Sequence, residues 1–271
     1  MTCKASSEKI RNTLNELEGS EWLKFTKSWF ILTPPRRTMK NGHPATFPDE
    51  LAEQFIKFFS KEGQWVLDPF GGMASTLVAA RKLKRNSVGV ELYEHFAAQG
   101  KLRLSMTLGE SKALFLQGDS RFLKNILNGH NIPELDFCLT SPPYWSQLER
   151  TSERQQKRLK NGLRTSYGDS EADLGKIESY NEFLKEQEKI FDSVYDVMRN
   201  RSYLVVVTNN IYAHGKVWPL AFDTFASLSK KWVPKDERIW CQDNKSLQPF
   251  GMFNSYIGNR SHHYCLVFRK D

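Results

Sequence analysis

The sequence is short of the features that assign a protein to a special class. Its 271 residues contain no apolar run near the roughly 20 residues that cross a bilayer, and the amino terminus lacks the apolar core of a secretion signal. The four cysteines lie far apart without a CxxC pair, and the six histidines do not cluster. These absences argue against a zinc site or a disulfide framework, and they predict a metal-free protein of the reducing cytoplasm.

Acidic residues are fewer than basic ones. The chain has 39 Lys and Arg against 31 Asp and Glu, a net charge of +8, which favours a polyanion such as nucleic acid as partner. Much of the excess lies in the polar segment 147–164, where the only acidic residues are Glu149 and Glu153. Its cations are Arg150, Arg154, Lys157, Arg158, Lys160 and Arg164. A solvated surface helix or loop is the alternative interpretation of this segment.

Apolar runs alternate with helix-period segments over a length that suits one domain, residues 1–271. Strands are predicted at 65–67, 87–91, 113–116, 135–139, 203–207, 237–240 and 264–268. Helices are predicted at 49–59, 74–83, 180–198 and 217–228. This alternation predicts an α/β fold with a doubly wound, mostly parallel seven-stranded sheet, whose last two strands form an antiparallel hairpin.

The stretch VLDPFGGMAST, residues 66–76, ends a strand at Asp68, turns through Gly71 and Gly72, and enters a helix. Glycines let a ligand approach the backbone, and a helix amino terminus offers free N–H groups. This geometry is typical of nucleotide sites at the carboxyl edge of a doubly wound sheet. The phosphate-binding patterns GxGxxG and GxxxxGK[ST] are absent, and an acidic turn disfavours a pyrophosphate. The turn therefore predicts a nucleoside ligand with a positively charged group.

Carboxylates end three successive predicted strands, at Asp68, Glu91 and Asp119. Glu91 follows Asp68 at close to the spacing of roughly 20 residues at which a carboxylate binds ribose hydroxyls. Any one of the three alone is more often a helix cap or turn residue. Together they suit S-adenosylmethionine, with Glu91 on the ribose, Asp119 on the adenine amine and Asp68 near the amino acid part. The Phe70 ring either lies beside the sulfonium or packs in the core.

A second motif, TSPPYW at residues 140–145, follows the apolar run 135–139. Two consecutive prolines forbid further strand pairing, so the chain leaves its strand into a rigid aromatic corner. Cys138, within the strand, has no partner motif and is expected in the core.

With DPFGG at 68–72, VGVEL at 88–92 and TSPPYW at 140–145, the sequence resembles the DNA aminomethyltransferases, which modify exocyclic amines of cytosine or adenine. Their signature [DNS]-P-P-[YFW] reads SPPY here. HPATFPDELAEQFIKFF at 43–59 resembles the family's segment that closes over the methionine part of the cofactor, and SHHYCLVFRK at 261–270 resembles its final strand. The cofactor motif precedes the catalytic motif, which looks like a circular permutation of the commonest order in this subgroup.

The resemblance implies a site for S-adenosylmethionine and a base turned out of the duplex. Expected cofactor contacts are His43, Phe47, Pro48, Asp68, Pro69, Phe70, Gly71, Gly72, Glu91, Asp119, Ser120 and Thr140. Ser141 and the carbonyl of Pro142 are expected to accept the amine hydrogens, with Pro143 stiffening the corner and Tyr144 stacking on the base. Trp145 either extends that stack or anchors the corner in the core. It is counted with the six cations of 147–164 among the expected DNA contacts.

Double-stranded DNA is the expected partner, contacted by a basic insertion at 147–168 and by a second recognition loop at 242–260. A monomer or weak dimer at the nucleoid is expected. The sequence leaves open whether a cognate restriction endonuclease belongs to the same system. Ser141 stands where most adenine-specific relatives carry Asp or Asn, so N4-methylcytosine is the favoured product. The alternatives are N6-adenine methylation, RNA base methylation, and a DNA-binding module whose cofactor pocket has decayed.

Overall fold

The structure is a computed structural model that describes residues 12–33, 47–145 and 170–271. Its helices are α1 (Gly19–Phe25), α2 (Asp49–Phe59), α3 (Ser75–Lys82), α4 (Glu94–Ser105), α5 (Leu123–Asn128), α7 (Tyr180–Val197) and α8 (Leu220–Leu228). Its strands are β1 (Trp29–Ile31), β2 (Trp65–Asp68), β3 (Asn86–Glu91), β4 (Ala113–Gln117), β5 (Leu135–Thr140), β6 (Met198–Thr208), β7 (Ile211–Ala213), β8 (Lys216–Trp218), β9 (Val233–Cys241) and β10 (His262–Arg269). Short 3-10 turns lie at η1 (Ser120–Phe122) and η2 (Leu174–Lys176).

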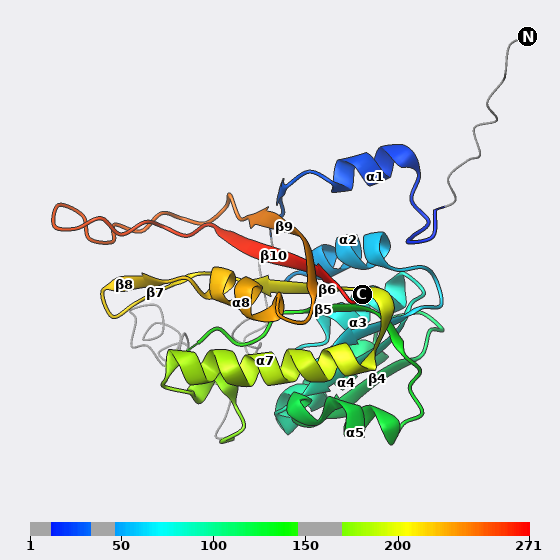
Figure 1. Ribbon diagram of the computed structural model, residues 1–271. Helices are drawn as coiled ribbons and strands as arrows, with labels where there is room; N and C mark the ends of the chain where they lie inside the picture. Colours follow the sequence, from blue (N-terminus) through cyan, green and yellow to red (C-terminus); the bar gives the residue numbers. More distant parts are fainter. Residues whose placement is uncertain (1–11, 34–46, 146–169) are drawn as a thin grey trace, which may run out of the picture.

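Eight of these strands form one sheet in the order β1-β9-β10-β6-β5-β2-β3-β4 (Figure 1). All seven predicted strands are present in it. The central pairs are parallel, and β10 is antiparallel to both β6 and β9, as the predicted hairpin requires. The predicted α/β fold class is therefore confirmed.

Two short pairings were not predicted. The eighth strand, β1, comes from the amino-terminal segment and pairs in parallel with β9. Strands β7 and β8 form a separate antiparallel pair. Because Lys216–Trp218 belongs to β8, the helix predicted from residue 217 begins at Leu220 instead. None of the described helices is long and apolar enough to cross a bilayer.

Helices cover both faces of the sheet because alternate strand residues point to opposite sides. Phe137 and Leu139 of β5 pack in the same core cluster as Leu51 and Phe55 of α2. Cys138, between them in sequence, packs in the opposite cluster with residues of α7 and is fully buried. The expected core position of Cys138 is confirmed.

The ring of Phe115 in β4 occupies space that three glycines leave open. A Cβ atom would lie 2.2 Å from this ring at Gly71, 2.2 Å at Gly100 and 2.8 Å at Gly89. These residues come from the turn after β2, from α4 and from β3. The backbones of all three elements therefore pack directly against one buried aromatic ring. The glycine at position 71 is thus explained by internal packing.

We predict that Gly100→Ala destabilises the protein although Gly100 lies inside α4. Alanine in a helix interior normally stabilises by roughly 0.5–1 kcal/mol relative to glycine. Here its methyl group would overlap the Phe115 ring, and overpacking costs typically about 1–3 kcal/mol. A net loss of about 1–2 kcal/mol is expected as a lower urea midpoint with an unchanged slope. Gly19→Ala is the matched control, because no atom lies within 4 Å of the added Cβ. A midpoint for Gly100→Ala at or above that of the unsubstituted protein would contradict this packing.

Candidate active site

Asp68, the last residue of β2, is the most connected of the predicted site residues. Its carboxylate accepts hydrogen bonds from the hydroxyls of Thr76 at 2.6 Å and Thr140 at 2.7 Å, and from the N–H of Phe70 at 3.1 Å. The side chain is 2% exposed, and burial raises the pKa of Asp68 while these bonds oppose the shift. Thr76 lies in α3 and Thr140 ends β5, so Asp68 fastens the glycine turn to the strand that leads into the corner.

The glycine turn is fixed against the neighbouring strand β3. The N–H of Gly71 donates to the carbonyl of Val90 at 2.8 Å, and the N–H of Gly72 donates to the carboxylate of Glu91 at 2.8 Å. Gly72 and Ala74 both have left-handed backbones, with φ of 49° and 61°. A side chain is disfavoured in that region, which explains the glycine at position 72.

Glu91 ends β3 beside this turn. Its other carboxylate oxygen accepts the N–H of Tyr93 at 3.0 Å. Burial raises the pKa of Glu91 to about 7, and the carboxylates of Asp68 and Asp173 add to the shift. This edge of the sheet therefore carries negative groups that are costly to ionise together, and a cation placed there would relieve the cost.

Asp119 and Ser120 follow β4, the third of the acidic strand ends. Asp119 pairs with the guanidinium of Arg121 at 2.7 Å, and Arg121 also reaches Glu186 of α7 at 3.0 Å. The Ser120 hydroxyl is buried and donates to the carbonyl of Pro69. Ser120 thus holds the loop after β4 against the glycine turn, and Asp119 holds Arg121 against α7, roles that sequence reasoning missed. The Asp119 side chain keeps 19% of its surface exposed.

The corner at 141–145 leaves β5 between the ends of β2 and β6. Tyr144 is half-buried, and its hydroxyl shares a hydrogen bond of 3.0 Å with Nδ1 of His263, 119 residues away. Burial raises the pKa of Tyr144, and a hydrogen bond with Ser141 opposes that shift. The phenol is therefore neutral and is held by His263.

His263 is a site residue that the sequence did not single out. It is the second residue of β10, and its ring stacks on Trp240 of β9 with centroids 4.9 Å apart. Burial lowers the pKa of His263 to about 3, with Lys245 and His262 contributing, so the imidazole is neutral. The Trp240 indole in turn donates to the carbonyl of Leu32 at 2.9 Å. The only signal in the sequence was the pair of histidines at the start of the last predicted strand.

Trp145 anchors the corner in the core. It is 4% exposed, and its indole N–H donates to the carbonyl of Ile177 at 2.9 Å. Its ring makes edge contacts with Tyr180 at 5.0 Å and Trp218 at 4.7 Å. Of the two roles left open for Trp145, the structure supports the anchor. This burial argues against the DNA contact that the sequence suggested for Trp145.

The segment 170–178 runs across the carboxyl edge and was also missed. Asp173 accepts the hydroxyl of Tyr93 at 2.8 Å and the N–H of Gly175 at 2.8 Å. A Cβ at Gly175 would lie 3.8 Å from the Pro143 side chain. The segment therefore contacts Tyr93 after β3 and Pro143 after β5. No local sequence pattern predicts these contacts.

The other predicted residues divide into described and undescribed ones. Phe47 is 8% exposed and its carbonyl accepts the hydroxyl of Ser75 at 3.2 Å, while Pro48 precedes α2. These two residues therefore lie close to the start of α3. His43 and the insertion 147–168, including Arg150, Arg154, Lys157, Arg158, Lys160 and Arg164, lie outside the described residues. Among the residues that are described, no three His, Cys, Asp or Glu side chains gather as a metal site requires.

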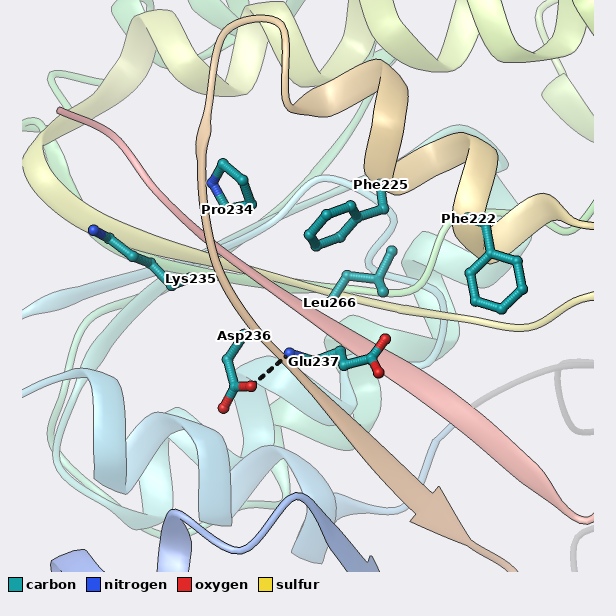
Figure 2. Close-up of a pocket in the computed structure, with 7 residues that line it drawn as sticks. All are labelled: Phe222, Phe225, Pro234, Lys235, Asp236, Glu237 and Leu266. Carbon is teal, nitrogen blue, oxygen red and sulfur yellow. Dashed lines mark hydrogen bonds between the residues drawn. The ribbon is translucent and has the colours of Figure 1, made fainter.

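A separate pocket lies between α8 and the last two strands, and Figure 2 shows the residues that line it. It is lined by Phe222, Phe225, Pro234, Lys235, Asp236, Glu237 and Leu266. Four of these belong to the first half of β9. Strand β10 is antiparallel to both β6 and β9, so β9 runs in the same direction as β6 and β5, and its first half lies at the amino ends of the parallel strands. None of the predicted site residues contributes to it.

We predict that Glu91→Gln changes the pH dependence of stability. With its pKa raised to about 7 from 4.5, Glu91 keeps a proton in the folded state that the unfolded chain releases. Its contribution is therefore fully present below about pH 4.5 and is lost as the pH rises through 7, a fall in the free energy of unfolding of about 3 kcal/mol. Urea unfolding at pH 4.5 and 8 without ligand should show this fall in the unsubstituted protein and its absence in Glu91→Gln.

The exposed Glu62→Gln serves as control and should follow the unsubstituted protein at both pH values. Parallel pH curves for Glu91→Gln and the unsubstituted protein would mean that Glu91 ionises normally.

Comparison with known proteins agrees with this geometry. A family model described as DNA methylase matches residues 4–102 and 135–271. The sequence is 34% identical over 104 residues to the Type II methyltransferase M.MthZI of Methanothermobacter thermautotrophicus, covering 37% of this chain and 29% of that protein. It is 40% identical over 81 residues to the Type II methyltransferase M.MjaI of Methanocaldococcus jannaschii, covering 28% and 24%. The matched stretches thus span less than a third of these relatives.

The solved structure of TrmN from Thermus thermophilus has the same type of fold. It superposes with a TM-score of 0.50 at 14% identity, over 82% of this chain and 48% of that one. The family model covers most of the chain, including both the glycine turn and the SPPY corner. It confirms the resemblance drawn from the sequence and, with it, S-adenosylmethionine as the cofactor. The chain belongs to the DNA methylase family whose members methylate N6 or N4 amines.

Proposed function

We propose that this chain transfers a methyl group from S-adenosylmethionine to the exocyclic amine of a cytosine turned out of double-stranded DNA, giving N4-methylcytosine. The observation that carries the proposal is the carboxylate of Asp68, which binds Thr76 behind the glycine turn and Thr140 in front of the corner. The two motifs typical of this chemistry are thereby held side by side.

The acidic edge fits the cofactor chemically. Glu91 uses its oxygens on two backbone N–H groups, and a carboxylate has about four acceptor positions, so ribose hydroxyls still find partners. Asp119 retains an exposed side for the adenine amine. The ring of Phe70 packs partly against the core, with its centroid 6.5 Å from that of Phe191, and its remaining exposed part would contact the sulfonium. When bound, S-adenosylmethionine supplies an electrophilic methyl group.

The corner suits a weak nucleophile. The lone pair of an amine on an aromatic ring is delocalised, and it must be drawn out of conjugation before it can attack. The carbonyl of Pro142, whose direction the two prolines fix, and the hydroxyl of Ser141 are the acceptors for the amine hydrogens. Acceptors that are in place before the substrate arrives lower the barrier because no reorganisation is needed.

Tyr144 supplies the surface for the base. The hydrogen bond to His263 fixes the position of the hydroxyl end of the ring. Stacking on an aromatic ring is worth roughly 1–3 kcal/mol per base and offsets part of the cost of taking the base out of the duplex.

DNA is the substrate that the charge and the family favour. The net charge of +8 suits a polyanion, and phosphate contacts would come from the insertion 147–168 and the loop 242–260. A monomeric or weakly dimeric state and a nucleoid location stay predictions from the sequence. Ser141 supports cytosine over adenine through the family regularity alone.

Mass spectrometry of nucleosides tests the reaction. DNA from a host expressing the chain should contain N4-methylcytosine, and Ser141→Ala should lower turnover on the same DNA at least about a hundredfold, the usual cost of one preorganised partner. Binding of S-adenosylmethionine by calorimetry should change little, because Ser141 faces the amine. Sequencing of the modified bases gives the methylated site at the same time.

The other outcomes identify the alternatives. N6-methyladenine as the only product would overturn the cytosine assignment and keep the enzyme class. Methyl transfer to transfer RNA but not to duplex DNA would overturn the DNA assignment.

Tyr144 and His263 should behave as one unit. Tyr144→Phe keeps the ring and removes the hydroxyl, while His263→Leu removes the partner; each should lower turnover about tenfold, roughly the worth of one buried hydrogen bond. The double variant should be no slower than either single one, since both remove the same interaction. His263→Asn, which keeps a polar atom near the position of Nδ1, should recover part of the loss. Losses that multiply in the double variant would show that the two residues act separately.

A further inference from the structure

The β7–β8 pair is a small hairpin that stands outside the main sheet. Ala213 of β7 is paired with Lys216 of β8. The two residues between them, His214 and Gly215, form the turn and have left-handed backbones, with φ of 51° and 75°. Two such residues give the type I′ turn, whose twist matches that of a hairpin, and histidine tolerates this backbone region better than most residues. The hairpin therefore has a defined tip.

The inner face of the hairpin is fixed to the corner. Ala213 and Trp218 pack in the same apolar cluster as Trp145. The Trp218 indole donates to the carbonyl of Ala213 at 3.1 Å, and its ring centroid lies 4.7 Å from that of Trp145. The ring of His214, at the tip, lies 6.3 Å from the Trp145 ring. Because Trp145 directly follows Tyr144, the hairpin keeps a set distance from the ring that is proposed to receive the base.

The tip of the hairpin is open to solvent. His214, Gly215 and Lys216 are exposed, and Val217 is 49% exposed. Within the described part of the chain, no atom lies within 4 Å of a Cβ added at Gly215. Figure 1 shows the hairpin pointing away from the sheet, on the same side as the loop 242–261. The hairpin thus combines a fixed base with an accessible tip.

Charge favours a nucleic acid as the partner of this tip. The stretch 197–222, which contains the whole hairpin, has no acidic residue. The ammonium of Lys216 lies over the Trp218 ring at 3.9 Å, and Arg260 lies over the ring of Tyr212 at 6.0 Å. A contact with a ring face positions a cation without cancelling its charge. The hairpin can therefore approach a phosphate backbone without repulsion between like charges.

The shape of the hairpin suits the major groove of DNA. That groove admits either an α-helix or a two-stranded β-ribbon. Inside it, lysine donates to O6 and N7 of guanine, and the two nitrogens of an imidazole offer a donor and an acceptor to base edges. With adjacent residues about 3.8 Å apart, the His214 ring lies roughly 10 Å from Tyr144, which corresponds to about three base-pair steps of about 3.4 Å.

We propose that His214 and Lys216, at the tip of the β7–β8 hairpin, read base pairs in the major groove within about three positions of the target base. The inference rests on the proposed function and deepens it, because it names a part of the chain that selects the methylated site. Trp145 holds the hairpin and the corner together, so the bases that are read stand at a fixed spacing from the base that is methylated. This element adds to the two segments expected from the sequence, 147–168 and 242–260.

The test uses the full chain and the base modification that it makes. In the double variant His214→Asn/Lys216→Ala, asparagine keeps the turn, since Asn-Gly is a preferred pair for type I′ geometry. Sequencing of modified bases should show the same methylated base, in a site that has become degenerate or changed at one or two positions within about three base pairs. The ratio of kcat/KM for the original site to that for a site changed at one such position should fall at least about tenfold, the usual worth of one base contact.

The matched control is His130→Asn/Lys101→Ala. It removes the same two side chains from exposed positions, one after α5 and one within α4. The control should keep both the site and the ratio, and neither double variant should change S-adenosylmethionine binding by calorimetry. Lys216→Ala alone leaves the turn residues as they are, so it should show part of the same change even if the double variant has a lower urea midpoint.

Three results would overturn the inference. An unchanged site and ratio would remove the tip from recognition, and equal loss of activity on every sequence would make it a phosphate contact only. An unchanged site together with a dimer that only the double variant loses in sedimentation would make the tip a contact between two copies of the chain. Failure of the proposed function is seen separately, as an unsubstituted protein that methylates no DNA, and the inference falls with it.

Discussion

The site depends on one buried carboxylate. Asp68 is nearly inaccessible, and its three partners, two hydroxyls and one N–H, are all neutral donors. A buried carboxylate is tolerated only while it is hydrogen-bonded, so the donors must stay in place. Because they come from the turn, from α3 and from the end of β5, the glycine turn and the SPPY corner cannot move apart without leaving this group unpaired. The two motifs are thereby held together before any ligand binds.

Around Asp68, the carboxyl edge of the sheet is loaded with negative groups. The raised pKa of Glu91 reflects its burial and the neighbouring carboxylates. Either a proton on Glu91 or a cation bound nearby reduces the repulsion among these carboxylates. A ligand with an ammonium and a sulfonium would therefore lower the pKa of Glu91 and favour its ionised form. The carboxylate of Asp119 is instead paired with Arg121, which also forms an ion pair with Glu186 of α7. The edge therefore favours a cationic ligand beside Asp68 and Glu91, while the negative charge of Asp119 is balanced by the protein itself.

The sequence was sufficient wherever local periodicity or a compact motif decided the structure. The central strands, α2 and the strand-end positions of Asp68 and Glu91 follow from such patterns. It was insufficient where partners are distant. The three residues of β1 become a strand only because β9 lies beside them, and Trp145 is an anchor only because Ile177, Tyr180 and Trp218 surround it. The sequence suggests that Gly71 lets a ligand approach the backbone, whereas the structure shows that the Phe115 ring occupies the space beside it. None of these contacts leaves a trace in spacing or composition.

The chain of contacts from Tyr144 through His263 to Trp240 extends the candidate site into the last two strands. Motif searches stop at the SPPY corner, yet the phenol of that corner is positioned by residues at the root of the β9–β10 loop. The His263 ring is held between the Tyr144 hydroxyl on one side and the Trp240 ring on the other, so a displacement at the start of β10 would also displace the partner of that hydroxyl. The position of the corner thus depends on residues of two strands, each more than 90 positions further along the chain.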